Sequence, residues 1–313
     1  MPEHVPARGG NPVEASTSIG PAGAVPPPGG WGNPAEPSAS IVQADAVPAR
    51  GYDLPDPPAS AVQRPDLLAV EEPLEIRIGG EPLTVTMRTP GDDIDLAAGF
   101  LFTEGIVGAA ADIAEIRKCD DNVADVRLRP GMMVAQDRLR RNFLTTSACG
   151  VCGKQSIDMV RTRASFDVTA DNVLLTAETL VRLPGRLREE QRLFARTGGL
   201  HAAAIFTAEG TLIALREDVG RHNAVDKLIG WALRTARLPL TGSVLLVSGR
   251  ASFELAQKAL MAGIPVLAAV SAPSSLAVEL AAEAGMTLVG FLRGGSMNAY
   301  TGAHRLQLAH ASH

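Results

Sequence analysis

The spacing of hydrophobic and polar positions changes along the chain, and each spacing predicts a different element. Apolar residues alternate with polar ones over 74–78 and 83–87, with Gly79-Gly80 between the two runs. A period of two is typical of half-buried strands, so these runs predict a hairpin. Over 92–101 the apolar residues recur three or four apart, which predicts a helix with one buried face. Further short strands are expected around 113–116 and 123–128.

The second half of the chain predicts strands and helices in alternation. Apolar runs at 244–247, 266–270 and 286–292 enclose two stretches with helical spacing, 253–261 and 276–284. This order favours a parallel sheet with helices on its faces, so the fold class is α/β. Ligands of such sheets bind outside the carboxyl ends of the strands. We therefore expect a site at the turns that follow these runs.

Residues 1–66 show none of these periods, and they hold 14 of the 22 prolines. Such a segment cannot bury enough apolar surface to offset its ordering entropy, so we predict a disordered Pro/Gly/Ala-rich tail. The remaining chain predicts a small α+β domain over 67–168 and an α/β domain over 169–313.

Charge and hydropathy remove several classes of protein. The net charge is −5, from 34 acidic and 29 basic residues, and nucleic acid is not an expected partner because phosphate binding draws on surplus Lys and Arg. The longest apolar tract, 261–292, is broken by Pro265, Pro273 and Glu279. A membrane span needs about 20 consecutive apolar residues, so no membrane is expected. The N-terminus, with Glu3 and no basic start before an apolar run, favours a cytoplasmic protein without a secretory signal.

Two of the three cysteines stand close together, in Cys149-Gly150-Val151-Cys152. Three cysteines cannot build a disulfide framework, and a structural zinc site needs further ligands at suitable spacing. Cys119 stands alone and the six histidines are scattered, so we predict no structural metal. The pair instead predicts a nucleophilic thiol in an accessible loop, 146–153. Nearby cations, Lys154 and the arginines of 138–141, would lower a thiol pKa, although these arginines also fit a plain solvated surface.

Polar turns follow the predicted strands of the second half. Ser248-Gly249-Arg250 precedes a helix, whose free N–H groups and dipole favour anions, so Ser248 and Arg250 are candidate phosphate ligands. The stretch 271–275 repeats this pattern, and Arg293-Gly294-Gly295-Ser296 follows the last strand. Together the turns predict a nucleotide pocket, although each alone is also typical of an ordinary turn.

Two histidines lie beside Gly-containing turns, His201 and His222. For both, a structural hydrogen bond and a catalytic role stay open. The polar stretch 217–222 also fits a purely local ion cluster at the start of a helix near Asn223.

Several stretches in order along the chain resemble the formate dehydrogenase accessory sulfurtransferase family. These stretches are Glu71-Glu72-Pro73-Leu74, Thr89-Pro90-Gly91-Asp92, 99–105, 147–153, Thr197-Gly198-Gly199-Leu200-His201, 216–227, Ser248-Gly249-Arg250 and Phe291-Leu292-Arg293-Gly294-Gly295-Ser296. They cover nearly everything from residue 70 onward.

The resemblance implies a sulfur carrier. Such a protein accepts sulfur from a cysteine desulfurase and passes it to the molybdenum cofactor in its bis(molybdopterin guanine dinucleotide) form, before insertion into formate dehydrogenase. Cys149 matches the persulfide-bearing cysteine and Cys152 its companion, while Phe291-Leu292-Arg293-Gly294-Gly295-Ser296 matches the cofactor-binding segment. The resemblance also implies a homodimer and a cytidine deaminase-like fold.

Three alternatives compete with the sulfur carrier. A zinc deaminase needs a histidine followed two residues later by glutamate, with Pro-Cys-x-x-Cys downstream; His201 is followed by Ala202 and Ala203, and the cysteine pair lies upstream. A chaperone that only holds the cofactor would keep the nucleotide pocket without needing the cysteines. A thiol-disulfide oxidoreductase would carry the pair at a helix start just after an early strand.

Overall fold

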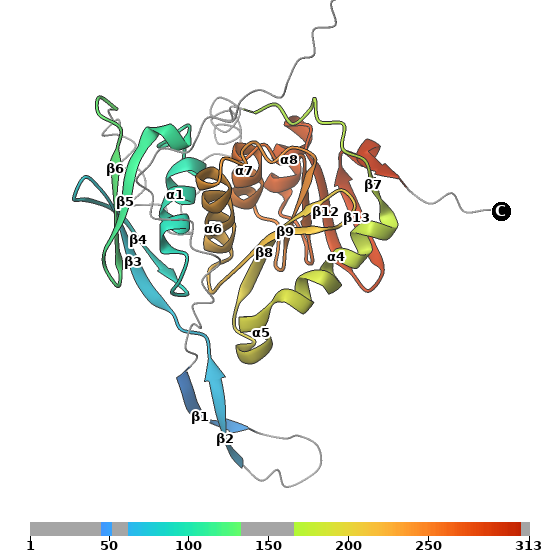
Figure 1. Ribbon diagram of the computed structural model, residues 1–313. Helices are drawn as coiled ribbons and strands as arrows, with labels where there is room; N and C mark the ends of the chain where they lie inside the picture. Colours follow the sequence, from blue (N-terminus) through green and yellow to red (C-terminus); the bar gives the residue numbers. More distant parts are fainter. Residues whose placement is uncertain (1–44, 52–61, 133–165, 308–313) are drawn as a thin grey trace, which may run out of the picture.

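The computed structural model describes residues 45–51, 62–132 and 166–307, and within them the fold is mixed α/β (Figure 1). Most of the described chain lies in two larger sheets and the helices that pack on them. None of the described helices has the length and apolar content to cross a membrane.

The larger sheet contains the parallel strands expected from the alternating pattern. The three strands are β10 (Ser243–Val247), β11 (Val266–Ala269) and β12 (Thr287–Arg293). They are joined through helices α7 (Phe253–Met261) and α8 (Ser275–Glu283), and the pairs β10–β11 and β11–β12 are parallel. The strand-helix order of the second half is therefore confirmed.

The same sheet also holds antiparallel strands that the spacing analysis did not single out. Its order within the described residues is β13-β12-β11-β10-β8-β9, where β8 is His201–Thr207, β9 is Leu212–Asp218 and β13 is Ser296–Thr301. Two hairpins account for this difference, because β8 returns as β9 past Gly210 and β12 returns as β13 past Gly294 and Gly295, all three with positive φ. The sheet is thus mixed rather than parallel.

Helices cover both faces of this sheet, and alternate strand residues meet them. Leu245 and Leu267 belong to the core shared with α7, α8 and α6 (Arg221–Arg234), whereas Val244 and Leu246 belong to the core shared with α4 (Ala177–Glu190). Successive side chains of a strand point to opposite faces, so α4 lies on the face opposite α6, α7 and α8. The short helix α5 (Arg192–Thr197) follows α4 directly.

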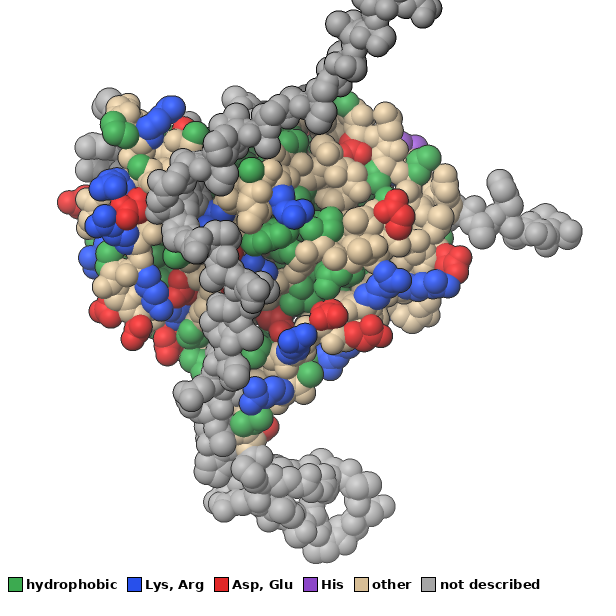
Figure 2. Space-filling model, in the orientation of Figure 1, with side chains coloured by type: hydrophobic (Ala, Val, Ile, Leu, Met, Phe, Trp, Pro, Cys, Tyr) green, Lys and Arg blue, Asp and Glu red, His purple; other side chains and the backbone are tan. Residues whose placement is uncertain are grey.

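The predicted hairpin and helix of the first half form the second sheet and its cover. The hairpin is β3 (Glu72–Ile78) and β4 (Glu81–Arg88), the helix is α1 (Asp93–Thr103), and β5 (Ile113–Asp120) and β6 (Val123–Leu128) complete the order β4-β3-β6-β5. In Figure 2, acidic and basic side chains are intermixed at this end of the molecule. Within the sheet, the Glu115 carboxylate pairs with Arg127 at 2.7 Å. This surface carries no field of a single sign.

Helices α1 and α6 join the two sheets (Figure 1). They cross where each has a glycine: a Cβ on Gly230 would lie 1.8 Å from the Asp95 carbonyl oxygen, and one on Gly99 would lie 1.9 Å from that of Asp226. Only glycine permits such a close backbone approach. One continuous hydrophobic core therefore runs from β3 through α1 and α6 to β12. The predicted domain boundary at residue 168 stays a prediction. The shared core shows that the two predicted domains pack against each other.

Two stretches of the predicted tail carry strand geometry. β1 (Asp45–Gly51) pairs antiparallel with β2 (Val62–Leu68), which departs from the prediction of a tail without regular structure over 1–66. Pro48 lies opposite Pro65, and a two-stranded ribbon accommodates proline because each strand is an edge. Residues 1–44 and 52–61 lie outside the described part.

The remaining described elements are short. They are the 3-10 helices η1 (Ala110–Asp112) and η2 (Ala303–Arg305), and the parallel pair β7 (Leu175–Thr176) and β14 (Leu306–Gln307).

Candidate functional site

The carboxyl ends of β10 and β11 bring two of the predicted polar turns together. The Ser271 N–H donates to the Gly249 carbonyl at 3.2 Å, and the Ser274 N–H donates to the Ala251 carbonyl at 2.9 Å. The Phe291 N–H of β12 in turn donates to the Ser271 carbonyl at 3.1 Å. Backbone hydrogen bonds thus fix Ser248–Ser252, 271–274 and Phe291 along one edge of the sheet.

The third predicted turn lies one step beyond this edge. Arg293-Gly294-Gly295-Ser296 is the reversal between β12 and β13, and a Cβ on either glycine would meet nothing within 4 Å. The exposed Arg293 has its guanidinium 5.7 Å from the Phe291 ring centre, and the Ser296 hydroxyl donates to the Arg293 carbonyl at 3.1 Å. This turn is open to a ligand, and its binding role stays a prediction.

Phe291 and Leu292 differ in what they offer a ligand. Phe291 has φ 51° at a bulge in β12, a backbone conformation that is rare for a bulky residue and is often found near functional sites. Its ring is half-buried. Leu292 is fully buried in the core beside α4, so its side chain is committed to packing and only its backbone is available for binding.

His201 reaches the same edge because β8 runs antiparallel to β10. The Ser248 N–H donates to the Ala202 carbonyl and the Ser248 hydroxyl accepts from the Ala202 N–H, both at 2.9 Å, which continues the pairing past the end of β10. A methyl group on Gly249 would lie 3.4 Å from the His201 ring. Burial lowers the pKa of His201, and the nearby Arg221 lowers it further.

His222 stands where α6 and α7 begin. Its Nε2 lies 3.4 Å from the Ser252 hydroxyl and 3.9 Å from a Glu254 carboxylate oxygen. Burial lowers the pKa of His222 to about 4, with the charge of Lys258 as the next cause. His222 is therefore neutral near pH 7, and one of its ring nitrogens can accept a hydrogen bond.

The sequence was compatible with a purely local ion cluster over 217–222, and the structure shows such a cluster only in part. Asp218 is fully buried, pairs with Lys227 at 2.7 Å and accepts from the Gly220 N–H at 2.8 Å, so its role is structural. Glu217 accepts from the N–H groups of Leu193 and Phe194 at 3.0 and 2.8 Å. Glu217 thereby fixes the start of α5 against the sheet.

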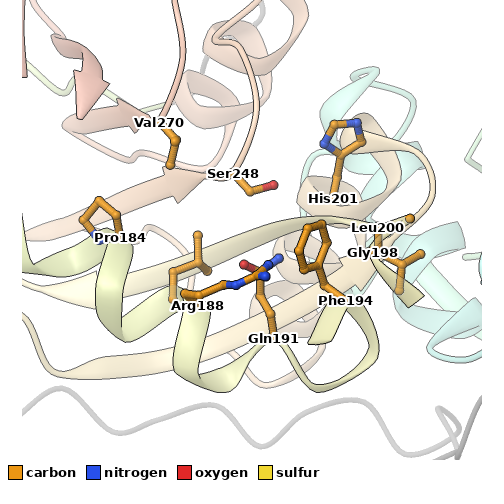
Figure 3. A pocket seen from close by; sticks show the side chains of 11 residues that line it. Pro184, Arg188, Gln191, Phe194, Gly198, Leu200, His201, Ser248 and Val270 are labelled. Atoms are coloured by element: carbon orange, nitrogen blue, oxygen red, sulfur yellow. The ribbon is translucent and has the colours of Figure 1, made fainter. Parts of the chain in front are cut away.

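A pocket of about 510 Å³ opens between this edge and helices α4 and α5 (Figure 3). Its volume falls within the range typical of small-molecule sites. Ser248, His201 and Val270 line the sheet side; Arg188, Gln191 and Phe194 line the helix side, together with Pro184, Leu187, Gly198, Gly199 and Leu200.

Of the helix-side residues, the sequence analysis singled out only Gly198, Gly199 and Leu200, as part of a family motif, and it missed those of α4 and α5, including Arg188, Gln191 and Phe194. One signal was present: Leu180, Leu183 and Leu187 form the buried stripe of α4, and Gln191 occupies the next position of that stripe. A polar amide where the helical period calls for an apolar residue marks a candidate site.

The paired cysteines, Cys149 and Cys152, lie outside the described residues, as does their loop. Cys119 is exposed at the end of β5, with its sulfur 3.9 Å from the Arg117 carbonyl. Across 66–132 and 166–307, the side chains that the structure describes, no group of three His, Cys, Asp or Glu residues is placed to hold a metal ion.

Comparisons with known proteins place the chain in context. The model of the FdhD/NarQ family matches residues 69–307. "Sulfur carrier protein FdhD" of Streptomyces avermitilis is 61% identical over 259 residues, which covers 80% of this chain and 92% of that protein. The protein of the same name from Mycobacterium tuberculosis is 56% identical over 257 residues, 78% of this chain and 93% of that protein.

A solved structure extends this likeness to the fold. It is a protein from Desulfotalea psychrophila described as a formate dehydrogenase accessory protein, with a TM-score of 0.65 and 22% sequence identity over 84% of this chain and 99% of that chain. At this identity the comparison supports the fold alone.

Proposed function

Because the chain belongs to the FdhD/NarQ family, we propose that it is a sulfur carrier required for formate dehydrogenase activity, with Cys149 as the sulfur-bearing residue. Membership of the family confirms the resemblance predicted from the motifs. The observation that carries the proposal is the cysteine pair, which is present in a chain that matches proteins named sulfur carriers over most of its length.

The loading step is a thiol exchange. The Cys149 thiolate attacks the outer sulfur of a persulfide on a cysteine desulfurase, the bond between the two donor sulfurs breaks, and the desulfurase cysteine leaves as a thiolate. The product is Cys149–S–SH, whose outer sulfur keeps the proton that it carried on the donor, and no net oxidation takes place. Cys152 either shields this persulfide or attacks Cys149 sulfur, which gives a disulfide and releases hydrogen sulfide.

The acceptor in this proposal is the molybdenum cofactor in its bis(molybdopterin guanine dinucleotide) form, a substrate rather than a resident group. The edge formed by Ser248, Arg250 and Phe291–Ser296 suits an anionic ligand, because it presents backbone N–H groups at the start of α7 and two exposed arginines, Arg250 and Arg293. A homodimer, a cytoplasmic location, formate dehydrogenase as the recipient and a cytidine deaminase-like fold belong to the same proposal.

A cofactor chaperone is the second candidate function. The pocket between α4, α5 and the sheet edge favours it, because the described residues that line this pocket include no cysteine. The two functions differ in whether sulfur must be held covalently.

Substitution of Cys149 separates the two candidates. We expect Cys149→Ser to abolish cofactor sulfuration and formate oxidation while leaving the melting temperature and nucleotide binding unchanged, since an oxygen cannot hold sulfane sulfur. Cys152→Ser should retain part of the activity, and Cys119→Ser, outside the pair, serves as the matched control with full activity. Normal maturation by Cys149→Ser would reject the sulfur carrier and leave the chaperone.

A further inference from the structure

Helix α5 is attached only lightly to the rest of the described fold. None of its residues is fully buried, although β2 lies beside it. Its shape comes from its own backbone, because the Ala195 N–H donates to the Gln191 carbonyl at 3.0 Å and the Gly198 N–H donates to the Phe194 carbonyl at 2.7 Å. A segment that buries few apolar contacts opens at a lower free energy than the core.

One carboxylate, that of Glu217 in β9, ties α5 to the sheet. It accepts from the Leu193 N–H at 3.0 Å and from the Phe194 N–H at 2.8 Å. Both N–H groups belong to the first turn of the helix, where backbone donors have no partner within the helix, and the side chain of Gln191 forms no capping bond. Among the hydrogen bonds of the described residues, these two alone join α5 to another helix or strand. The attachment therefore depends on a single side chain.

The chain changes direction on both sides of α5. Gln191, with φ −76° and ψ 75°, separates it from α4, and Gly198, with φ 65°, ends it. A Cβ on Gly198 would meet nothing within 4 Å, and one on Gly199 would make only ordinary contact with the Ala69 Cβ at 3.6 Å. Hinges typically lie at such ends of elements. α5 can thus turn without moving α4 or β8.

The position of α5 decides whether the helix side of the pocket is complete. Phe194 of α5 lines the pocket, and its ring centre lies 4.0 Å from the guanidinium of Arg188 in α4. Figure 3 shows this pair on the helix side, across the pocket from Ser248. A turn of α5 away from the sheet would withdraw Phe194 and separate it from Arg188.

From these contacts we propose that α5 is a lid of this pocket, hinged at Gln191 and Gly198, and that Glu217 is the latch that holds it closed. The proposal rests on the proposed function, because it takes the occupant of the pocket to be the nucleotide part of the proposed substrate. It adds a residue that does not line the pocket and that controls how long the occupant stays. Glu217 is a positioning residue, since it reaches the ligand only through α5.

Amide hydrogen exchange on the full chain without ligand tests the lid. In the unsubstituted chain, the amides of Ala195 and Gly198 should exchange at least about tenfold faster than those of β8, because α5 opens locally and β8 opens only with the sheet. Glu217→Gln removes the charge and one of the two acceptor oxygens, so exchange in α5 should rise by about another tenfold. Exchange in β8 should not change, and the melting temperature should stay within about 2 °C.

GDP is the probe of the latch. In the unsubstituted chain, bound GDP should slow exchange in α5, and in Glu217→Gln the dissociation rate of GDP should rise at least about fivefold without slower association. Glu190→Gln is the matched control, since Glu190 is an exposed glutamate that ends α4 and does not line the pocket. This variant should match the unsubstituted chain in both measurements.

Several results would overturn the lid. They are equal exchange rates in α5 and β8 of the unsubstituted chain, unchanged exchange or GDP dissociation in Glu217→Gln, and faster exchange throughout that variant, which would make Glu217 a general structural residue. Absence of GDP binding by the unsubstituted chain would reject the nucleotide side of the proposed function and the lid with it, whereas normal binding with unchanged kinetics in Glu217→Gln rejects the lid alone. Substitution of Cys149 tests sulfur transfer separately.

Discussion

Gly230→Ala is expected to destabilise the protein strongly, although it adds one methyl group. The new Cβ would lie 1.8 Å from the Asp95 carbonyl oxygen and 2.7 Å from the Gly99 nitrogen, both backbone atoms of α1. Restoring ordinary van der Waals contact needs the two helices to separate by roughly 1.5 Å. No rotamer change can relieve a contact between backbones.

The separation also strains the polar contacts that join α1 to α6 and α7. Thr103 donates to Asp226 at 2.8 Å, Lys258 donates to Thr103 at 2.9 Å, and Asp95 pairs with Arg234. Overpacking in a core costs typically 1–3 kcal/mol, and we place this substitution at about 3 kcal/mol because only movement of a whole helix relieves it. For a domain of this size, that loss lowers the melting temperature by roughly 6–12 °C.

Differential scanning calorimetry measures this effect, with Gly185→Ala as the matched control. Gly185 is an exposed glycine inside α4 with nothing within 4 Å of its Cβ position. Alanine is the better helix former by roughly 0.5–1 kcal/mol, so this variant should melt slightly higher than the unsubstituted chain. If Gly230→Ala melted within 2 °C of the unsubstituted chain, roughly the shift expected from 1 kcal/mol, the close crossing of α1 and α6 would be refuted.

Two further predictions concern buried and half-buried charges. Lys258 donates to both carboxylate oxygens of Asp226 at 2.9 Å, so Lys258→Met leaves a buried carboxylate without its ion-pair partner. The free energy of unfolding in chemical denaturation should fall by about 3–5 kcal/mol, and the double variant Asp226→Asn/Lys258→Met should regain most of this loss. A double variant no more stable than Lys258→Met would contradict the prediction. The pKa of His222 is lowered from 6.5 to about 4, so the unfolded chain binds more protons between these values and stability should fall as pH falls through this window. In His222→Gln, the melting temperature should depend less steeply on pH in this window. The change should be modest, because the His222 side chain is 37% exposed and its charge is screened by solvent. The same pH dependence in His222→Gln and in the unsubstituted chain would count against the burial of this ring.

The sequence by itself determined the individual helices and strands whose apolar residues recur with a regular period. The hairpin at 74–78 and 83–87 and the helix after Asp92 appear as β3, β4 and α1, because each depends on which face of one element is buried. The alternating order of the second half appears as β10, α7, β11, α8 and β12 for the same reason. The motifs along the chain also sufficed to identify the family, since they require only residue types in order.

Tertiary structure decided which of these elements meet. The period of β8 does not reveal that it runs antiparallel to β10, yet this direction places His201 beside Gly249. Leu292 belongs to a family motif and is nonetheless buried under α4, whereas Gln191, outside every motif, faces the pocket. Gly99 and Gly230 are 131 positions apart in the chain, and only the crossing of α1 and α6 makes them a pair. Sequence spacing reports the buried face of one element, while a site and a helix crossing depend on contacts between distant elements, whose geometry no local period contains.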